Sequence, residues 1–121
     1  MSLYLNQMKP WVTVICVCYN HENYVEEALR SVVEQTYPNV KLIVIDNGST
    51  DQSADRIAQF ARQHPAVRFL KNRANLGLNR AFNQGLAIAG GRYVIDLSTD
   101  DVLLPNRIAR QSDLFERLSG P

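Results

Sequence analysis

Hydrophobic and polar residues follow one another in blocks that predict strands separated by helices. Residues 12–19 form an almost continuous run of β-branched and other apolar side chains, which is typical of a strand covered on both faces. Apolar runs of the same kind follow at residues 42–45, 67–70 and 92–98. The intervals between these runs are long enough for a helix after each strand.

The intervals show the three-to-four-residue spacing of amphipathic helices. Their apolar positions are, in chain order, Val25, Ala28, Leu29, Val32 and Val33, then Ala54, Ile57, Ala58 and Ala61, then Leu78, Ala81, Phe82, Gly85, Leu86 and Ala89. We predict that Ser49 or Thr50 caps the second helix. Gly90–Gly91 is expected to close the third helix, and a last helix is expected from about Pro105 to Leu118.

Alternating strands and helices with buried strands predict an α/β fold of three layers. Helices would cover both faces of a mainly parallel sheet, and residues 1–121 would form a single domain. In such a sheet the loops after the first, second and fourth strands meet at one edge, where α/β proteins bind ligands. We therefore expect Tyr19–Asn20, Asp46–Asn47 and Asp100–Asp101 to face one cleft.

The composition narrows the class of partner. The chain is 45% hydrophobic and 21% charged, and its 13 basic and 12 acidic residues give a net charge of +1 without a run of one sign. Nothing in this balance indicates a nucleic-acid or anionic membrane partner. No apolar stretch approaches the roughly 20 residues that cross a bilayer, and the N-terminus lacks the pattern of a signal peptide.

Cys16 and Cys18 alternate within the first predicted strand, so their side chains share a face. A zinc site needs four ligands and the chain has no further cysteine, so we interpret both as small buried hydrophobic residues. Unpaired thiols are typical of a reducing compartment, and we expect a cytoplasmic protein. His21 and His64 show no metal-ligand spacing and are expected at the surface.

Two adjacent carboxylates, Asp100 and Asp101, come directly after the fourth predicted strand. Paired carboxylates provide the hard oxygen ligands that hold Mg²⁺ or Mn²⁺ against a diphosphate. Acidic residues at the start of a loop also remain solvated or cap a helix, so both interpretations stay open. Asp96, in the middle of the same strand, has no explanation in the sequence alone.

The other polar positions at strand ends have two interpretations each. Tyr19 either packs at the end of its strand or stacks on a nucleobase. Asp46 and Asn47 either form a turn or contact a ligand, since the Asn47 amide offers the donor and acceptor that match uracil or thymine. Arg80 follows Gly77 at the start of a predicted helix, and it either contacts a phosphate or is solvated.

With these residues in order, the chain resembles the nucleotide-binding half of family 2 glycosyltransferases of the GT-A fold, from about Trp11 to Leu118. The matching segments are residues 12–20, residues 42–51, Asn75–Gly77 with Ala81, Asn83 and Gly85, and residues 99–105. The resemblance implies a Rossmann-like GT-A domain truncated on its C-terminal side. It also implies an inverting transfer of sugar from a UDP-, dTDP- or GDP-linked donor to an acceptor hydroxyl, in cell-envelope polysaccharide synthesis.

The resemblance also implies roles for individual residues. The nucleotide-sugar site would contain Val17, Tyr19, Asp46, Asn47, Arg80 and Asp100. Tyr19 and Asn47 would lie beside the base and Asp46 would support their loop. Asp100 would lie near the ribose and the metal, and Asp101 would bind the Mg²⁺ or Mn²⁺.

Three positions depart from the family pattern. Asn47 replaces the second acid of an Asp-Asp-Gly-Ser loop, and Val17 stands where proline is frequent. Ser98 replaces the first acid of an Asp-x-Asp-Asp loop.

The resemblance implies that the general base lies beyond residue 121, so we expect no catalytic residue in this chain and no activity of the chain alone. Two alternatives remain. A nucleotidyltransferase would carry a glycine-rich basic loop after the first strand, where this chain has residues 19–23 without glycine or lysine. A non-catalytic binding module of the same fold would explain the short length and Ser98.

An incomplete sheet would also leave an apolar edge that favours a homo-oligomer.

Overall fold

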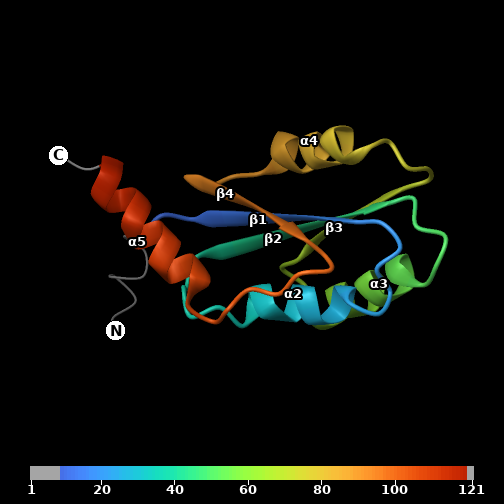
Figure 1. The fold of residues 1–121 in the computed structure, drawn as a ribbon, viewed down its shortest axis with the longest axis horizontal. Helices are drawn as coiled ribbons and strands as arrows, with labels where there is room; N and C mark the ends of the chain where they lie inside the picture. The colour runs from blue at the N-terminus through green and yellow to red at the C-terminus, as the bar shows by residue number, and fades with distance from the viewer. Residues whose placement is uncertain (1–8, 120–121) are drawn as a thin grey trace.

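The computed structural model describes residues 9–119, in which strands and helices alternate (Figure 1). The N-terminal residues that were expected to lack a signal-peptide pattern lie outside this range. The elements are β1 (Val12–Cys18), α2 (Val25–Val33), β2 (Val40–Asn47), α3 (Ser53–Gln63), β3 (Arg68–Asn72), α4 (Leu78–Ile88), β4 (Tyr93–Ser98) and α5 (Arg107–Ser119).

The strands form one four-stranded parallel sheet in the order β3-β2-β1-β4. Figure 1 shows α4 on one face of this sheet and α2 and α3 on the other, which confirms the predicted three-layer α/β/α arrangement. Cys18 of β1 pairs with Asp46 of β2, and Val17 pairs with Ser98 of β4. The carboxyl ends of β1, β2 and β4 therefore lie level with one another.

The residues of β1 and most of β2 are buried on both sides of the sheet, and both faces are apolar. All seven residues of β1 are buried. The side that carries α2 and α3 holds the larger cluster, which includes Val14, Cys16, Leu29, Ile57 and Ile108. The side that carries α4 holds the smaller cluster, which consists of Ile15, Val17, Ile43, Ile45 and Ala81.

The start of α3 differs from the prediction that Ser49 or Thr50 caps it. The Ser49 hydroxyl instead donates to Asp46 Oδ1 at 2.6 Å, and the helix begins at Ser53. Asp51 Oδ1 accepts the Ser53 amide N–H at 2.8 Å, so the carboxylate of Asp51 satisfies one amide N–H at the start of the helix. The Ser49 hydroxyl thus does not cap α3, because it is hydrogen-bonded to Asp46 instead.

The start of α5 lies two residues after the predicted position at Pro105. The carbonyl oxygen of Pro105 accepts the amide N–H of Thr36 at 2.8 Å, which joins this segment to the end of α2. The Arg107 amide N–H donates to the Leu104 carbonyl in a turn at 3.0 Å. Only after this turn does the chain become helical, at Arg107.

Strand β4 lies at one end of the sheet and is covered on one face only. Tyr93, Ile95 and Leu97 point toward the larger cluster. Val94 and Asp96 are exposed on the opposite face, because α4 packs on β1 and β2. The Asp96 carboxylate, which the sequence left unexplained, therefore lies in water and needs no buried partner.

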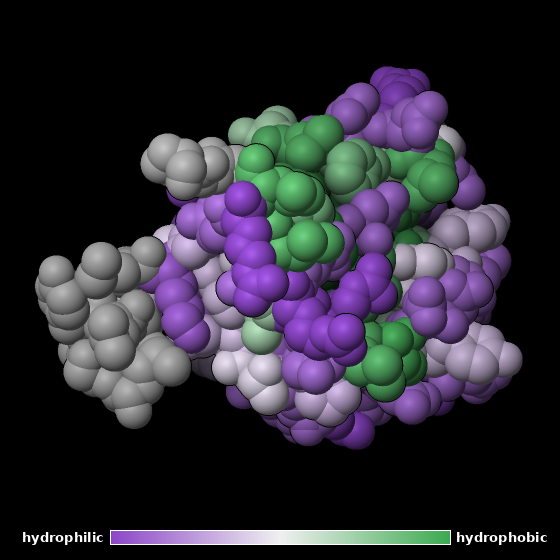
Figure 2. All heavy atoms as spheres, turned by 60° about the vertical axis from the view of Figure 1, so that its left-hand side comes forward, coloured by the Kyte–Doolittle hydropathy of each residue, from purple (hydrophilic) through white to green (hydrophobic). Residues whose placement is uncertain are grey.

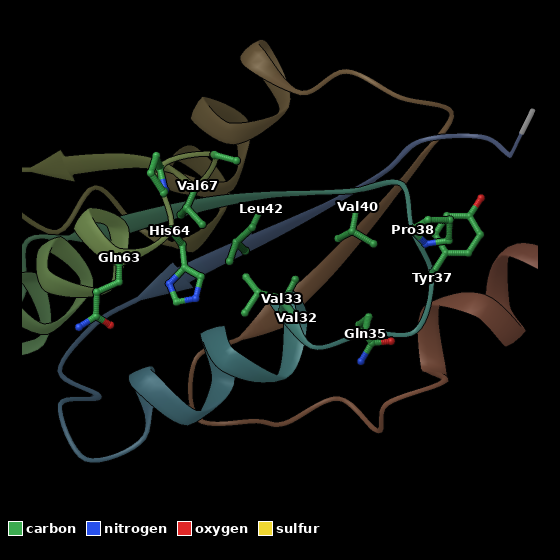
Figure 3. Close-up of a pocket in the computed structure, with 12 residues that line it drawn as sticks. Val32, Val33, Gln35, Tyr37, Pro38, Val40, Leu42, Gln63, His64 and Val67 are labelled. Atoms are coloured by element: carbon green, nitrogen blue, oxygen red, sulfur yellow. The ribbon is translucent and has the colours of Figure 1, made fainter. Parts of the chain in front are cut away.

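A cavity of about 350 Å³ lies at the amino ends of the strands, away from the polar loops (Figure 3). Aliphatic side chains of α2 and β2, among them Val32, Val40 and Leu42, line it between Tyr37 at one end and His64 at the other. The His64 ring stacks on Phe60 with ring centroids 4.1 Å apart. His64 is therefore half-buried, whereas the sequence placed it at the surface.

The surface shows hydrophobic side chains interspersed with hydrophilic ones, as seen on the side where α5 comes forward (Figure 2). Leu114 and Leu118 on α5 are 51% and 76% exposed. In the part of the chain that the structure describes, no helix has the length and apolar character needed to span a membrane.

We predict that Gly85→Ala destabilises the protein although alanine favours helices. A Cβ at position 85 would lie 2.7 Å from Cγ2 of Ile15 and 3.1 Å from Cδ1 of Ile45. Such overpacking costs about 1–3 kcal/mol in the free energy of unfolding, measured by urea denaturation. Ala87→Gly, an exposed position in the same helix, is the control and should cost about 1 kcal/mol through helix propensity. A more stable Gly85→Ala variant would contradict the close packing of α4 on the sheet.

We also predict that neither cysteine reacts with a thiol reagent in the native protein at neutral pH. Cys16 and Cys18 are both fully buried, and burial raises the pKa of each thiol, so the reactive thiolate is scarce. Colorimetric titration should detect both free thiols only after denaturation. Rapid labelling of the native protein would show that β1 is more open than the structure indicates.

Candidate functional site

Four loops meet at the carboxyl edge of the sheet because all four strands run in the same direction. They are residues 19–24 after β1, residues 48–52 after β2, residues 73–77 after β3 and residues 99–106 after β4. Hydrogen bonds join these loops to one another. The polar strand ends therefore lie at one edge of the sheet, as predicted, whereas their facing one common cleft stays a prediction.

Asn20 joins the loop after β1 to the loop after β2. Its backbone takes a left-handed conformation with φ of 55°, which asparagine tolerates better than most residues. Its Oδ1 accepts the amide N–H groups of Thr50 at 2.8 Å and Asp51 at 3.3 Å. Its own amide N–H donates to the Ser49 hydroxyl at 2.9 Å. Asn20 is thus the main connection between these two loops.

Asp46 is completely buried and turns back on its own loop. Its Oδ2 accepts the Ser49 amide N–H at 3.1 Å, and its Oδ1 accepts the Ser49 hydroxyl at 2.6 Å. Gly48, between them, has φ of 79°, and a Cβ there would lie 2.4 Å from the carbonyl carbon of Ala74. The loop after β2 therefore lies directly against the loop after β3, and only glycine fits at the crossing.

Asn47 is 2% exposed, and its amide makes hydrogen bonds within the protein. Its Oδ1 accepts the Asn72 side-chain amide at 3.2 Å and the Leu76 N–H at 3.0 Å. Its Nδ2 donates to Asn75 Oδ1 at 3.0 Å and to the Gly77 carbonyl at 3.4 Å. The two donors and two acceptor positions of the amide are thus used on residues 72–77, which leaves none for a base.

Asp100 and Asp101 are exposed at the end of β4. The Ser98 hydroxyl donates to Asp100 Oδ1, and this bond, together with the nearby His21, holds the pKa of the Asp100 carboxyl below its ordinary value. The Asp101 amide N–H donates to the Ser98 carbonyl at 3.0 Å, and Asp101 Oδ1 accepts the Val102 N–H at 2.9 Å. Each carboxylate keeps oxygen lone pairs free toward solvent.

This pair is chemically suited to a hard divalent cation but forms only part of a coordination shell. Across residues 9–119, no group of three or more His, Cys, Asp or Glu side chains is arranged to hold a metal ion. Mg²⁺ and Mn²⁺ sites commonly combine one or two carboxylates with phosphate oxygens and water. The donor set therefore fits a metal ion that arrives with a phosphate ligand.

His21 does not lie free at the surface as its sequence context suggested. Its side chain is 27% exposed, and its Nδ1 lies 2.7 Å from Oγ1 of the buried Thr99. Its Nε2 lies 3.9 Å from Asp100 Oδ2. His21 thereby links the loop after β1 to the loop that carries the two carboxylates.

The remaining predicted site residues differ in exposure. Tyr19 is 41% exposed directly after β1, and Arg80 is exposed in the first turn of α4. Val17 is 8% exposed and belongs to the apolar cluster beneath α4. Tyr19 and Arg80 thus offer side chains to a ligand, whereas the side chain of Val17 packs in the core.

Sequence reasoning placed Asn20 at this edge of the sheet but did not predict that Asn20, His21 and Thr99 hold the loops together. One local signal was available, since an asparagine directly after a buried strand favours a turn with a left-handed residue. No local signal marks Thr99 as buried, because its partner His21 lies 78 positions away in the sequence.

The family model for "Glycosyl transferase family 2" matches residues 13–119. An uncharacterized glycosyltransferase of Haemophilus influenzae is 34% identical over 108 residues, which cover 89% of this chain and 33% of that protein. The chain thus spans about a third of the length of this curated relative.

Solved structures give the same result. The mannosyltransferase PcManGT of Pyrobaculum calidifontis, in complex with GDP-Man and Mn²⁺, superposes with a TM-score of 0.81 at 29% identity and covers 96% of this chain and 34% of that one. TarS of S. aureus, in complex with UDP, has a TM-score of 0.79 at 25% identity, with coverage of 88% and 32%. The chain belongs to glycosyl transferase family 2 and has its Rossmann-like GT-A fold.

Proposed function

We propose that residues 1–121 form the donor-binding half of a GT-A domain in a glycosyltransferase. The enzyme would transfer a sugar from a nucleoside diphosphate donor to an acceptor hydroxyl, with inversion and with Mg²⁺ or Mn²⁺. The observation that carries this proposal is the exposed pair Asp100–Asp101, on a loop at the same sheet edge as the exposed ring of Tyr19. Family membership favours this function over nucleotidyl transfer.

The two carboxylates would hold the metal ion together with the diphosphate of the donor. When bound, the ion supplies Lewis-acid stabilisation of the negative charge on the departing diphosphate. The Ser98 hydroxyl, which donates to Asp100, keeps that carboxyl ionised and oriented. A donor complex with GDP-Man and Mn²⁺ in PcManGT supports this assignment for the present chain.

Tyr19 would stack on the nucleobase, because its ring is exposed at the end of β1 and an amphipathic aromatic side chain suits that contact. Asn47 would act indirectly, since its amide fixes residues 72–77. Asp46 likewise would fix the loop after β2 through Ser49. Arg80 would donate a charge-assisted hydrogen bond to a donor phosphate.

Inverting transfer requires a general base that takes the proton of the acceptor hydroxyl. The acceptor oxygen forms a bond to the anomeric carbon while the bond from that carbon to the diphosphate breaks. Asp100 and Asp101 are already assigned to the metal, and Asp46 and Asp51 accept hydrogen bonds within the segment after β2. We therefore assign no residue of this chain as the base, and we propose that the base comes from another part of a longer domain.

We predict that the protein binds a nucleoside diphosphate more tightly with Mn²⁺ than without it. Titration of UDP, GDP and dTDP by calorimetry should show this gain for at least one of them. Asp101→Ala should reduce the affinity in Mn²⁺ to the value measured without metal. Asp113→Ala removes an exposed carboxylate of α5 that pairs with Arg117, and this control should leave the affinity unchanged. The absence of metal-dependent binding with all three nucleotides would instead support a non-catalytic module.

We further predict that the chain of 121 residues transfers no sugar to an acceptor, because we propose that the general base lies outside these residues. The protein should be incubated with nucleotide sugars, Mn²⁺ and a panel of hydroxyl acceptors, and products detected by mass spectrometry. Acceptor-dependent product that disappears in Asp101→Ala would contradict this expectation. Hydrolysis of the donor without transfer would not contradict it, because water needs no acceptor site.

A further inference from the structure

His21 makes more contacts between loops than its place in a short turn suggests. Its backbone N–H donates to the hydroxyl of Ser53, the first residue of α3, at 2.9 Å. Its carbonyl oxygen accepts the N–H groups of Tyr24 and Val25 at 2.9 Å, where α2 begins. Its main chain is therefore fixed by two helix starts, and its imidazole ring has a defined position.

The ring projects from this fixed point toward the loop after β4. Nδ1 forms a 2.7 Å hydrogen bond with the Thr99 hydroxyl, and Thr99 is fully buried. Thr99 is the residue between the end of β4 and Asp100. A rigid residue of the β1 loop thus holds the backbone directly before the two carboxylates.

Few other contacts restrain this part of the loop. The Asp101 N–H donates to Ser98 within the same turn, and the Leu103 N–H donates to the Ser31 hydroxyl of α2 at 3.0 Å. Both Asp100 and Asp101 are exposed. The hydrogen bond of His21 to Thr99 is therefore a long-range restraint directly before Asp100 and Asp101, beside the contact of the Thr99 side chain with the Cys18 thiol of β1.

Resting on the proposed role of Asp100 and Asp101 in metal binding, we propose that His21 is a positioning residue for the metal loop. Its Nδ1 holds Thr99, and thereby sets the position of the two carboxylates against the diphosphate. Groups that orient metal ligands in this way change metal affinity by about 10- to 100-fold when they are removed. The ring makes its hydrogen bond through Nδ1, whereas Nε2, 3.9 Å from Asp100 Oδ2, interacts with that carboxylate through charge alone.

A set of substitutions distinguishes the contribution of the His21 Nδ1 from that of Nε2. His21→Ala removes both. His21→Asn keeps a hydrogen-bonding group near the position of Nδ1, whereas His21→Gln carries its amide near the position of Nε2. Thr99→Val removes the hydroxyl at nearly constant volume, and Thr99→Ser keeps it. Circular dichroism and thermal melts check that each variant is folded.

The first measurement is hydrogen exchange of the Asp101 amide by NMR, which requires no ligand. Exchange should become faster in His21→Ala, His21→Gln and Thr99→Val and remain as in the wild type in His21→Asn and Thr99→Ser. The Ser49 amide, bonded to Asp46 at the same sheet edge, is the internal control and should not change.

The second measurement is the gain in GDP or UDP affinity that Mn²⁺ provides. This gain should fall about 10- to 100-fold in His21→Ala and in Thr99→Val, and His21→Asn should retain it. The double variant His21→Ala with Thr99→Val should lose no more of the gain than Thr99→Val alone, because Thr99→Val already removes the hydrogen bond to His21. Affinity without metal should stay constant in all variants.

The outcomes separate this inference from the proposed function. Unchanged exchange at Asp101 in His21→Ala and Thr99→Val overturns the positioning role, whether or not nucleotide binds. Faster exchange with an unchanged Mn²⁺ gain also overturns it, since His21 would then serve the fold alone. Faster exchange in a protein whose wild type binds no nucleotide supports the positioning of the loop and rejects the proposed function.

Discussion

The parallel pairing of β1 with a strand on each of its sides determines where every polar residue of the site lies. Because β1 pairs with β2 and β4 from its first residue, Val12, the carboxyl ends of these strands are level. The pairing is fixed by burial, since every residue of β1 is buried and a shift by one residue would turn each side chain to the other face. The loops that follow β1, β2 and β4 therefore all lie at the carboxyl edge of the sheet.

Short polar side chains hold together the loops that the strands bring to one edge of the sheet. Asn20, Asn47 and Thr99 each use a hydroxyl or amide group to hold a neighbouring loop, and Asp46 uses its carboxylate to hold its own loop. Within residues 9–119 no buried side-chain polar atom lacks a hydrogen-bond partner. Such a satisfied network is rigid, because breaking one bond leaves a buried group unpaired. The exposed groups at this edge, Tyr19 and the two carboxylates, can therefore be positioned without a ligand present.

The sequence predicted the fold well because the signals for buried strands and amphipathic helices are local. It predicted which residues come to the carboxyl edge for the same reason. It did not reveal that Asn47 faces residues 72–77, or that His21 faces Thr99, because those partners are 25 and 78 positions away. The orientation of a loop side chain depends on distant neighbours, whereas the position of a strand end depends mainly on the strand itself.

Asp96 places a charge on β4, the outer strand of the sheet. Within the described residues β4 is a terminal strand of the sheet, and its backbone has no partner on one side. A strand from another molecule that paired there would have to place its own side chains beside an ionised carboxylate and remove some of its water. Charges on outer strands are a common protection against such self-association. The same acid that has no part in the site can thus help to keep the protein from aggregating.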